Sequence, residues 1–299
     1  MTEHLSLPPS SGIGQVITRF GADLLVETPD GLLRCTARRK LDHLACGDQV
    51  QWERQAQGNA AVTRILPRHN VLERPDFRGK PRAIAANIDL LVVVTAWQPA
   101  PLWDMLDRYL IAARRLSADV LLVMNKADLR ASHATAEDEA CLEEFQRIGL
   151  PILHVSAAQN EGVGEILRAI NERTAIVVGQ SGVGKSSIAV QLLPEEDIRV
   201  GAVADTGEGR HTTTSATLYR LPSGGTLIDS PGVRDFGLTG LDFAALERGF
   251  PEFAPFLGEC RFNNCTHQHE PGCAIKAAVS AGEIPARRFS RYLVLLAGL

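Results

Sequence analysis

One segment, residues 179–187, constrains the fold of this chain more than any other. Its sequence, Gly-Gln-Ser-Gly-Val-Gly-Lys-Ser-Ser, matches the phosphate-binding P-loop pattern. The apolar run at 174–178 predicts a buried strand, and the residues from Ser186 onward predict a helix. Strand, glycine-rich turn and helix are the context that this pattern requires. Because both flanks are present, a chance match is the weaker alternative, and the sequence predicts a nucleoside triphosphate site.

The residue types in this segment indicate how a polyphosphate would be held. Gly179 and Gly184 permit a tight backbone curve that side chains would block. The N–H groups of the loop and of the helix N-terminus would face the phosphates. Lys185 would reach the β- and γ-phosphates, and the Ser186 hydroxyl would coordinate Mg²⁺. The full set of predicted phosphate-loop residues is Gly179, Gln180, Ser181, Gly182, Val183, Gly184, Lys185, Ser186 and Ser187.

Length and composition set broad limits on the class of protein. A chain of 299 residues with 45% hydrophobic content predicts two or three globular domains. No apolar run approaches a membrane span, no secretory signal is visible, and Cys35, Cys46 and Cys141 are scattered as buried thiols would be. These features predict a cytoplasmic protein without a membrane partner. The net charge of −4 gives no overall attraction to nucleic acid, so any RNA contact must come from local patches.

The N-terminal part predicts a small β-barrel. Five short segments of β character alternate with turn signals, at residues 15–20, 23–28, 32–37, 48–54 and 61–66. This spacing is typical of the OB-fold, a barrel that often binds oligonucleotides. The basic residues Arg34, Arg38, Arg39 and Lys40 lie near one turn; RNA binding and ordinary surface charge are equally good interpretations of them. The basic, proline-containing stretch 74–82 predicts a linker.

Regular α/β alternation follows this stretch. Strands are expected at residues 88–96, 120–124, 151–155 and 174–178, with helices at 102–115, 134–148 and 162–172 between them. This order predicts a parallel sheet with crossover helices. Further strands are expected at 216–221 and 226–228.

The segment Asn125-Lys126-Ala127-Asp128 follows a predicted strand, where ligands bind in such sheets. The Asp128 carboxylate could accept hydrogen bonds from N1–H and the exocyclic amine of guanine, and adenine lacks both donors. Asn125 would tie the base to its loop, the Lys126 stem would pack over the ring, and the turn at Ser156-Ala157 could offer an N–H to guanine O6. A helix-capping turn is the structural alternative, but a P-loop in the same sheet favours a GTP or GDP site.

Residues 200–215 are polar and rich in glycine and threonine, as in a loop that orders around a γ-phosphate and Mg²⁺. One of Thr212–Thr214 should bind the metal; Thr213 is the working candidate, although the sequence does not separate the three. Asp229 would hold Mg²⁺ through water, and the Gly232 N–H would sense the γ-phosphate. The water-positioning glutamine common in GTPases is absent after Gly232, so His211 is the candidate to orient water, with a surface histidine as the alternative.

The order of these motifs is rotated relative to ordinary GTPases, in which the P-loop comes first. Here the base-reading segments precede it, so the sequence predicts a circularly permuted GTPase domain. The expected domains are a barrel at residues 1–70, the permuted GTPase domain at 71–240 and a small zinc-binding domain at 241–299.

Three cysteines and a histidine within fourteen residues predict one structural Zn²⁺ ion, held by Cys260, Cys265, His267 and Cys273. His269 is the alternative imidazole, and a small core of reduced thiols is the alternative without metal. Beyond this cluster, residues 287–292 alternate basic and aromatic side chains. This pattern suits RNA stacking or, equally, a helix that docks on the domain.

The permuted order, the P-loop, the segment Gly209-Arg-His-Thr-Thr-Thr214, residues 229–232 and the cysteine-histidine spacing resemble the bacterial ribosome small subunit-dependent GTPase A family (RsgA, also called YjeQ). The resemblance covers nearly the whole chain. It implies a late assembly factor that binds the 30S subunit, has GTPase activity stimulated by it and leaves after hydrolysis. It also implies barrel and zinc-domain contacts with 16S rRNA, and a catalytic role for His211.

A monomeric state is expected. Because the chain ends at Leu299, the C-terminal extension of some family members is expected to be short or missing. The alternative function is a nucleotide-gated RNA-binding scaffold in which turnover is incidental. A metabolic P-loop kinase is disfavoured by the base-reading segment and the threonine-rich loop.

Overall fold

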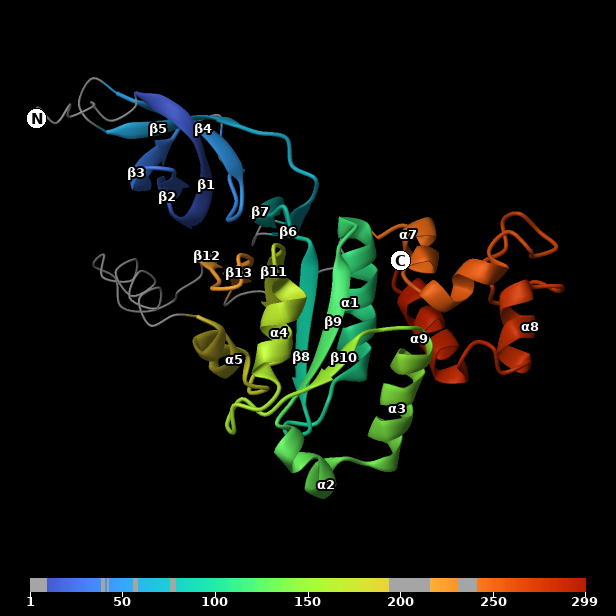
Figure 1. Ribbon diagram of the computed structural model, residues 1–299. Helices are drawn as coiled ribbons and strands as arrows, with labels where there is room; N and C mark the ends of the chain where they lie inside the picture. Colours follow the sequence, from blue (N-terminus) through green and yellow to red (C-terminus); the bar gives the residue numbers. More distant parts are fainter. Residues whose placement is uncertain are drawn as a thin grey trace, which may run out of the picture. The chain divides into compact units, whose positions relative to one another are not determined.

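The computed structural model describes residues 10–38, 41, 43–55, 59–75, 79–193, 216–230 and 241–299 (Figure 1). Within these ranges the chain divides into two compact units. The first draws on residues 1–90, 163–178 and 186–235, and the second on residues 91–162, 179–185 and 236–299. Each unit combines stretches that are distant in the sequence, and the domain boundaries expected near residues 70 and 240 stay predictions.

A closed five-stranded barrel lies in the first unit, as the turn spacing predicts. Its strands are β1 (Ser11–Phe20), β2 (Asp23–Thr28), β3 (Gly31–Ala37), β4 (Gln49–Arg54) and β5 (Ala60–Ile65). β1 pairs with β2 and β4, β2 with β3, and β5 with both β3 and β4. Inward side chains such as Val16, Leu24 and Trp52 are buried in one apolar cluster. Closure satisfies the backbone of every strand, which an open sheet of this size would not achieve.

The prediction of a linker at residues 74–82 was wrong. β6 (Val71–Pro75) and β7 (Pro81–Ala86) pair antiparallel as a hairpin, with Arg74 opposite Arg82. Two prolines are typical of an extended connector, but a proline at the end of an edge strand removes no hydrogen bond that the pairing needs. Small alanine side chains then let the hairpin pack on the segment between β3 and β4.

The first unit also holds part of the α/β region. Its elements are α4 (Val163–Ile170), β11 (Thr174–Val178), most of α5 (Lys185–Leu192), β12 (Thr217–Arg220) and β13 (Thr226–Asp229). β11 and β13 are parallel, and β12 runs antiparallel to β13. β12 also reaches barrel strand β1, where Thr217 lies opposite Thr18. The barrel and these strands therefore form one continuous sheet within the unit.

The second unit holds three strands in the order β10-β9-β8, with β9 and β10 parallel. Its elements up to residue 154 are β8 (Leu90–Ala96), α1 (Trp103–Leu116), β9 (Asp119–Asn125), η1 (Ala127–Leu129), α2 (Arg130–His133), α3 (Ala136–Arg147) and β10 (Ile152–His154). Every residue of β8 is buried, which explains its unbroken apolar sequence. The helix expected at 134–148 begins later because Thr135 and Asp138 form a capping box.

Short helices make up the C-terminal part of the second unit. They are α7 (Phe243–Arg248), η2 (Pro251–Phe256), α8 (Ala274–Ser280) and α9 (Ala286–Leu296). Their buried residues share one core with Ile111 of α1, and Phe250, Phe253 and Tyr292 form its aromatic centre. None of the helices in the described ranges combines the length and apolar character that a bilayer crossing demands.

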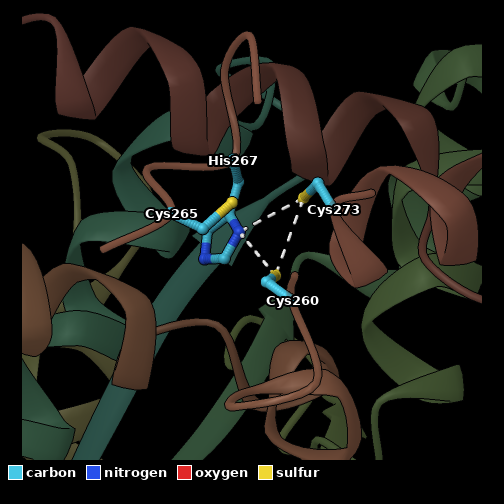
Figure 2. A group of neighbouring side chains, drawn as sticks. All are labelled: Cys260, Cys265, His267 and Cys273. Atoms are coloured by element: carbon cyan, nitrogen blue, oxygen red, sulfur yellow. Dashed lines mark hydrogen bonds between the residues drawn. The ribbon is translucent and has the colours of Figure 1, made fainter. Parts of the chain in front are cut away.

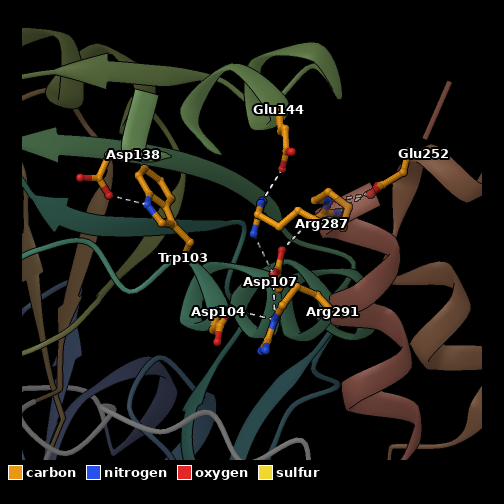
Figure 3. Close-up of polar contacts among 9 residues, drawn as sticks. Trp103, Asp104, Asp107, Asp138, Glu144, Glu252, Arg287 and Arg291 are labelled. Carbon is orange, nitrogen blue, oxygen red and sulfur yellow. Dashed lines mark hydrogen bonds and ion pairs between the residues drawn. The ribbon is translucent and has the colours of Figure 1, made fainter. Parts of the chain in front are cut away.

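A buried ion network fastens α9 to neighbouring elements of the same unit (Figure 3). Arg288 has no exposed surface and pairs with Asp107 of α1 and Glu252 of η2. Arg287 Nε lies 2.6 Å from Glu144 Oε2 of α3. Burial raises the pKa of Asp107 to about 6, although the neighbouring arginines oppose the shift. The basic and aromatic side chains of residues 287–292 therefore dock α9 on the rest of its unit. Of the two interpretations of that pattern, RNA stacking and helix docking, the structure supports helix docking.

Candidate functional site

The predicted base-reading segment turns sharply at the end of β9. Asn125 is buried, and Lys126 adopts a left-handed backbone with φ 55°. The N–H of Ala127 donates to the carbonyl of Val155 over 2.9 Å, which anchors the turn beside the end of β10. Asp128 follows in η1 and is exposed. Its carboxylate thus stands at the carboxyl ends of two parallel strands, where ligands bind in sheets of this kind.

The second predicted base-reading segment holds the first one in place. Ser156 Oγ donates to Asp128 Oδ1 over 2.6 Å, and the Ala157 N–H donates to Asn125 Oδ1 over 3.1 Å. Both Ser156 and Ala157 are buried. The hydroxyl orients the carboxylate, and a carboxylate has lone pairs enough to accept further hydrogen bonds from a guanine edge.

The base-reading segment also contacts the P-loop directly. Asn125 Nδ2 donates to the Val183 carbonyl over 2.8 Å, across 58 residues of sequence. Lys126 Nζ donates to the Gly182 carbonyl over 2.9 Å. The two segments therefore lie against each other within the second unit, and a single nucleotide can touch both.

Glycine is required by the shape of the P-loop. Gly179, Gly182 and Gly184 have φ values of 138°, 82° and 93°, in the left-handed region. A Cβ atom at position 179 would meet the carbonyl oxygen of Val94, and one at position 184 would meet the side-chain nitrogen of Asn125. At positions 179 and 184 the loop can approach Val94 and Asn125 this closely only because glycine has no Cβ atom.

Gly184→Ala is therefore expected to weaken GTP binding. The new Cβ would displace the Asn125 amide and strain the backbone by about 1–3 kcal/mol, which corresponds to roughly 5- to 150-fold in affinity. Equilibrium titration with a fluorescent guanine nucleotide measures the change. Gly164→Ala in α4 is the matched control, because its Cβ would meet no atom within 4 Å. Equal affinities for the two variants would contradict this role of Gly184.

Residues 98–100, which follow β8, form a third part of the site that sequence analysis missed. The Gln98 carbonyl accepts from Lys126 Nζ over 2.7 Å, and the Ala100 carbonyl accepts from Gln180 Nε2 over 3.0 Å. These contacts use backbone carbonyls, so no side-chain motif marks them. Their place after the carboxyl end of a strand was the available signal.

The other predicted nucleotide-site residues occupy several places. Lys185 Nζ donates to the carbonyls of Gly179 and Gln180, over 2.8 and 2.7 Å, so the lysine lies along its own loop. Ser186 and Ser187 lie in α5 and Asp229 ends β13, all in the first unit. The remaining candidates lie outside the described residues: His211, Thr213 and Gly232. Their roles stay predictions.

Four side chains at the C-terminal end of the second unit converge as the spacing predicts (Figure 2). The ligand atoms of Cys260, Cys265, His267 and Cys273 all lie within 4.8 Å of one another. The Sγ atoms of Cys260 and Cys273 are 3.9 Å apart, and His267 Nδ1 lies 3.6 and 3.3 Å from them. A tetrahedral Zn²⁺ with ordinary bond lengths separates its donors by roughly 3.6–3.8 Å, so these residues fit that ion. Burial raises the pKa of the Cys265 thiol to about 12, and a bound cation would favour its thiolate.

The fold and the site together define a class of protein. A closed barrel precedes an α/β region, and both predicted base-reading segments come before the P-loop, which the first of them contacts. This is the arrangement of a circularly permuted GTPase. The description "RsgA GTPase" belongs to the family model that matches residues 65–239, more than half of the chain. The chain belongs to the RsgA GTPase family, and it is a GTPase, an enzyme that hydrolyses GTP.

Whole-chain comparisons agree with this assignment. The "Small ribosomal subunit biogenesis GTPase RsgA" of Azotobacter vinelandii is 45% identical over 292 residues, which cover 96% of this chain and 85% of the relative. The protein of the same name from Chromohalobacter salexigens is 46% identical over 294 residues, with 96% and 86% covered.

Solved structures confirm the predicted fold class. YjeQ from Thermotoga maritima matches with a TM-score of 0.75 and 26% identity, over 97% of this chain and 98% of that one. YloQ, described as a circularly permuted GTPase, matches with a TM-score of 0.72 and 25% identity, over 100% and 97%. The rotated order of motifs therefore reflects a permuted GTPase fold rather than separate motifs brought together by chance.

Proposed function

We propose that this GTPase acts in a late step of 30S ribosomal subunit maturation, where GTP favours the bound state and hydrolysis leads to release. The observation that carries the proposal is the 45% identity, over 96% of the chain, with a relative named for small ribosomal subunit biogenesis. The barrel and the C-terminal region would supply contacts with 16S rRNA. A monomeric, cytoplasmic protein suits this role.

The contacts within the second unit support one way of holding GTP. Asp128, oriented by Ser156, would accept hydrogen bonds from guanine, and the Ala157 N–H would exchange its Asn125 partner for guanine O6. Lys185 and the P-loop amides would hold the phosphates. Bound Mg²⁺ would neutralise charge that develops between the β- and γ-phosphates. Ser186, one of Thr212–Thr214 and, through water, Asp229 are the proposed residues of the metal site.

Stimulation of GTP turnover by purified 30S subunits is the test of this function. His211→Ala is expected to lower the stimulated rate at least about 100-fold, because a positioned histidine typically contributes that much to activating water. Single-turnover phosphate release and co-sedimentation with 30S subunits give the rate and the bound fraction. His133→Ala, at an exposed position in α2, is the control and should hydrolyse GTP normally.

The outcome separates the proposed function from the scaffold alternative. If His211→Ala stops turnover and traps the protein on the subunit, hydrolysis controls release. If the 30S subunit leaves the rate unchanged, or if the variant departs normally, the maturation timer is refuted and a nucleotide-gated scaffold is favoured.

We also propose that the cysteine-histidine cluster holds one structural Zn²⁺ ion through Cys260, Cys265, His267 Nδ1 and Cys273. The donor separations and the burial of Cys265, His267 and Cys273 support the proposal. Four protein ligands close a tetrahedral site, so the ion would stabilise the fold and leave no position for a substrate.

A further inference from the structure

The imidazole of His267 has a carboxylate partner, largely shielded from solvent, on the side away from the cysteines. Its Nε2 lies 2.7 Å from Glu247 Oε1, while its Nδ1 faces the sulfur atoms of Cys260 and Cys273. The side chains of His267 and Glu247 are 4% and 17% exposed, so water competes little for this bond. Each ring nitrogen therefore has a separate and different neighbour.

Helix α7 presents two contacts to this ring from one face. Phe243 and Glu247 are four residues apart, which places them on the same side of the helix. The Phe243 ring stacks on the imidazole at a centroid distance of 6.3 Å, beside the carboxylate contact. Asp242 caps the start of the helix by accepting from the Ala245 N–H over 2.7 Å. The carboxylate is thus held by a capped, packed helix.

The backbone alone does not favour this orientation of the histidine. His267 has φ 64°, a left-handed backbone conformation that residues other than glycine adopt at a cost in free energy. Phe253 and Tyr292 enclose the ring from other sides, with centroid distances of 6.3 and 5.9 Å. These rings limit where the imidazole can lie, but they do not distinguish its two nitrogens. Glu247 does, because its carboxylate accepts a hydrogen bond only from a protonated nitrogen.

We propose that Glu247 is a positioning residue for the metal centre, and this proposal rests on the zinc site proposed above. By accepting from Nε2–H, it holds the tautomer in which the Nδ1 lone pair points at the three thiols. Carboxylates bonded to ligand histidines also increase the basicity of the coordinating nitrogen. Glu247 lies in α7, so the same bond links the metal centre to this helix.

Zinc affinity of the full-length protein, measured by chelator competition, tests this role. Glu247→Ala is expected to bind Zn²⁺ 10- to 100-fold more weakly, about the range for loss of such a partner. Glu247→Gln keeps the size and a neutral acceptor, so its loss should be smaller. Glu283→Gln is the matched control, since Glu283 is exposed in the turn between α8 and α9.

Cobalt spectra distinguish positioning from general stabilisation. With Co²⁺ in place of Zn²⁺, the visible absorption bands report ligand geometry, so they should shift in both Glu247 variants and stay unchanged in the Glu283→Gln protein. Circular dichroism of the metal-saturated proteins shows whether each variant is folded; if Glu247→Ala is not, Glu247→Gln decides.

Wild-type affinity and wild-type cobalt spectra in the Glu247 variants would overturn the positioning role while leaving the zinc site intact. Failure of the wild-type protein to bind Zn²⁺ would instead refute the zinc site itself, and the positioning role with it.

Discussion

Replacement of Asp128 by asparagine is expected to weaken GTP binding at least about 100-fold and to shift the preference of the site toward xanthosine triphosphate. The carboxylate can accept from two guanine donors, and Ser156 Oγ holds it in position over 2.6 Å. An asparagine amide would set its own N–H donor against the exocyclic amine of guanine and leave both donors unpaired. Xanthine carries an oxygen in place of the exocyclic amine, so the same amide can donate to it.

Competition between the two nucleotides for a fluorescent analogue measures this change directly. Asp30→Asn, in an exposed turn of the barrel, changes the charge equally and should leave both affinities unaltered. The Asn125 contact with the P-loop does not involve the Asp128 carboxylate, so the variant should fold normally. Unchanged GTP affinity would show that Asp128 does not read the base.

Arg288→Ala is expected to destabilise the second unit by about 3–5 kcal/mol, the usual range for removal of one partner from a buried ion pair. The variant would leave Asp107 and Glu252 without the guanidinium that joins them. It would also remove a cation from between the rings of Phe145 and Phe250, whose centroids lie 5.1 and 4.8 Å from the guanidinium carbon. Arg288→Lys should lose much of the same free energy, because an ammonium cannot bind two carboxylates through a planar fork.

Hydrogen exchange of the α9 amides reports this loss, since α9 carries Arg288 and is held by it. Exchange should accelerate roughly 150- to 5,000-fold in Arg288→Ala if the opened helix closes again faster than its amides exchange. Arg168→Ala is the control: its pair with Glu165 spans 3.8 Å and its side chain is 78% exposed, so its effect should stay below about 1 kcal/mol. Wild-type protection in Arg288→Ala would show that the network does not hold the helix.

Most of the fold could be predicted because its strands and helices follow from residue patterns within short segments of the sequence. The barrel strands are short segments of β character between clear turns, and the continuous apolar run of β8 indicates a strand buried on both faces. The β6–β7 hairpin was missed because its prolines obscure the strand pattern, and its pairing is stabilised by alanines that pack on the segment between β3 and β4. The sequence left two interpretations of residues 287–292 open, because arginine is rarely buried and the carboxylate partners of Arg288 lie far away in the sequence.

The candidate site divides in the same way. The P-loop, the base-reading segment and the cysteine-histidine cluster are short motifs, and their residue types alone indicate a chemistry. The contacts that support these motifs cannot be recognised from residue types. Gln98 acts through a backbone carbonyl, which every residue has, and Glu247 is an ordinary helical glutamate until His267 lies beside it.

The sequence by itself indicated which chemistries to expect of this chain: a P-loop for phosphate, a segment suited to guanine, and a cysteine-histidine set suited to a metal ion, because each depends on residue types within a few positions. Only the tertiary structure decided which segments meet. Asn125 reaches Val183 across 58 residues, and Asp107 pairs with Arg288 across 181. Such partners are brought together by the packing of whole helices and strands. The amino-acid sequence does not show how far apart in space two residues lie when they are distant in the chain.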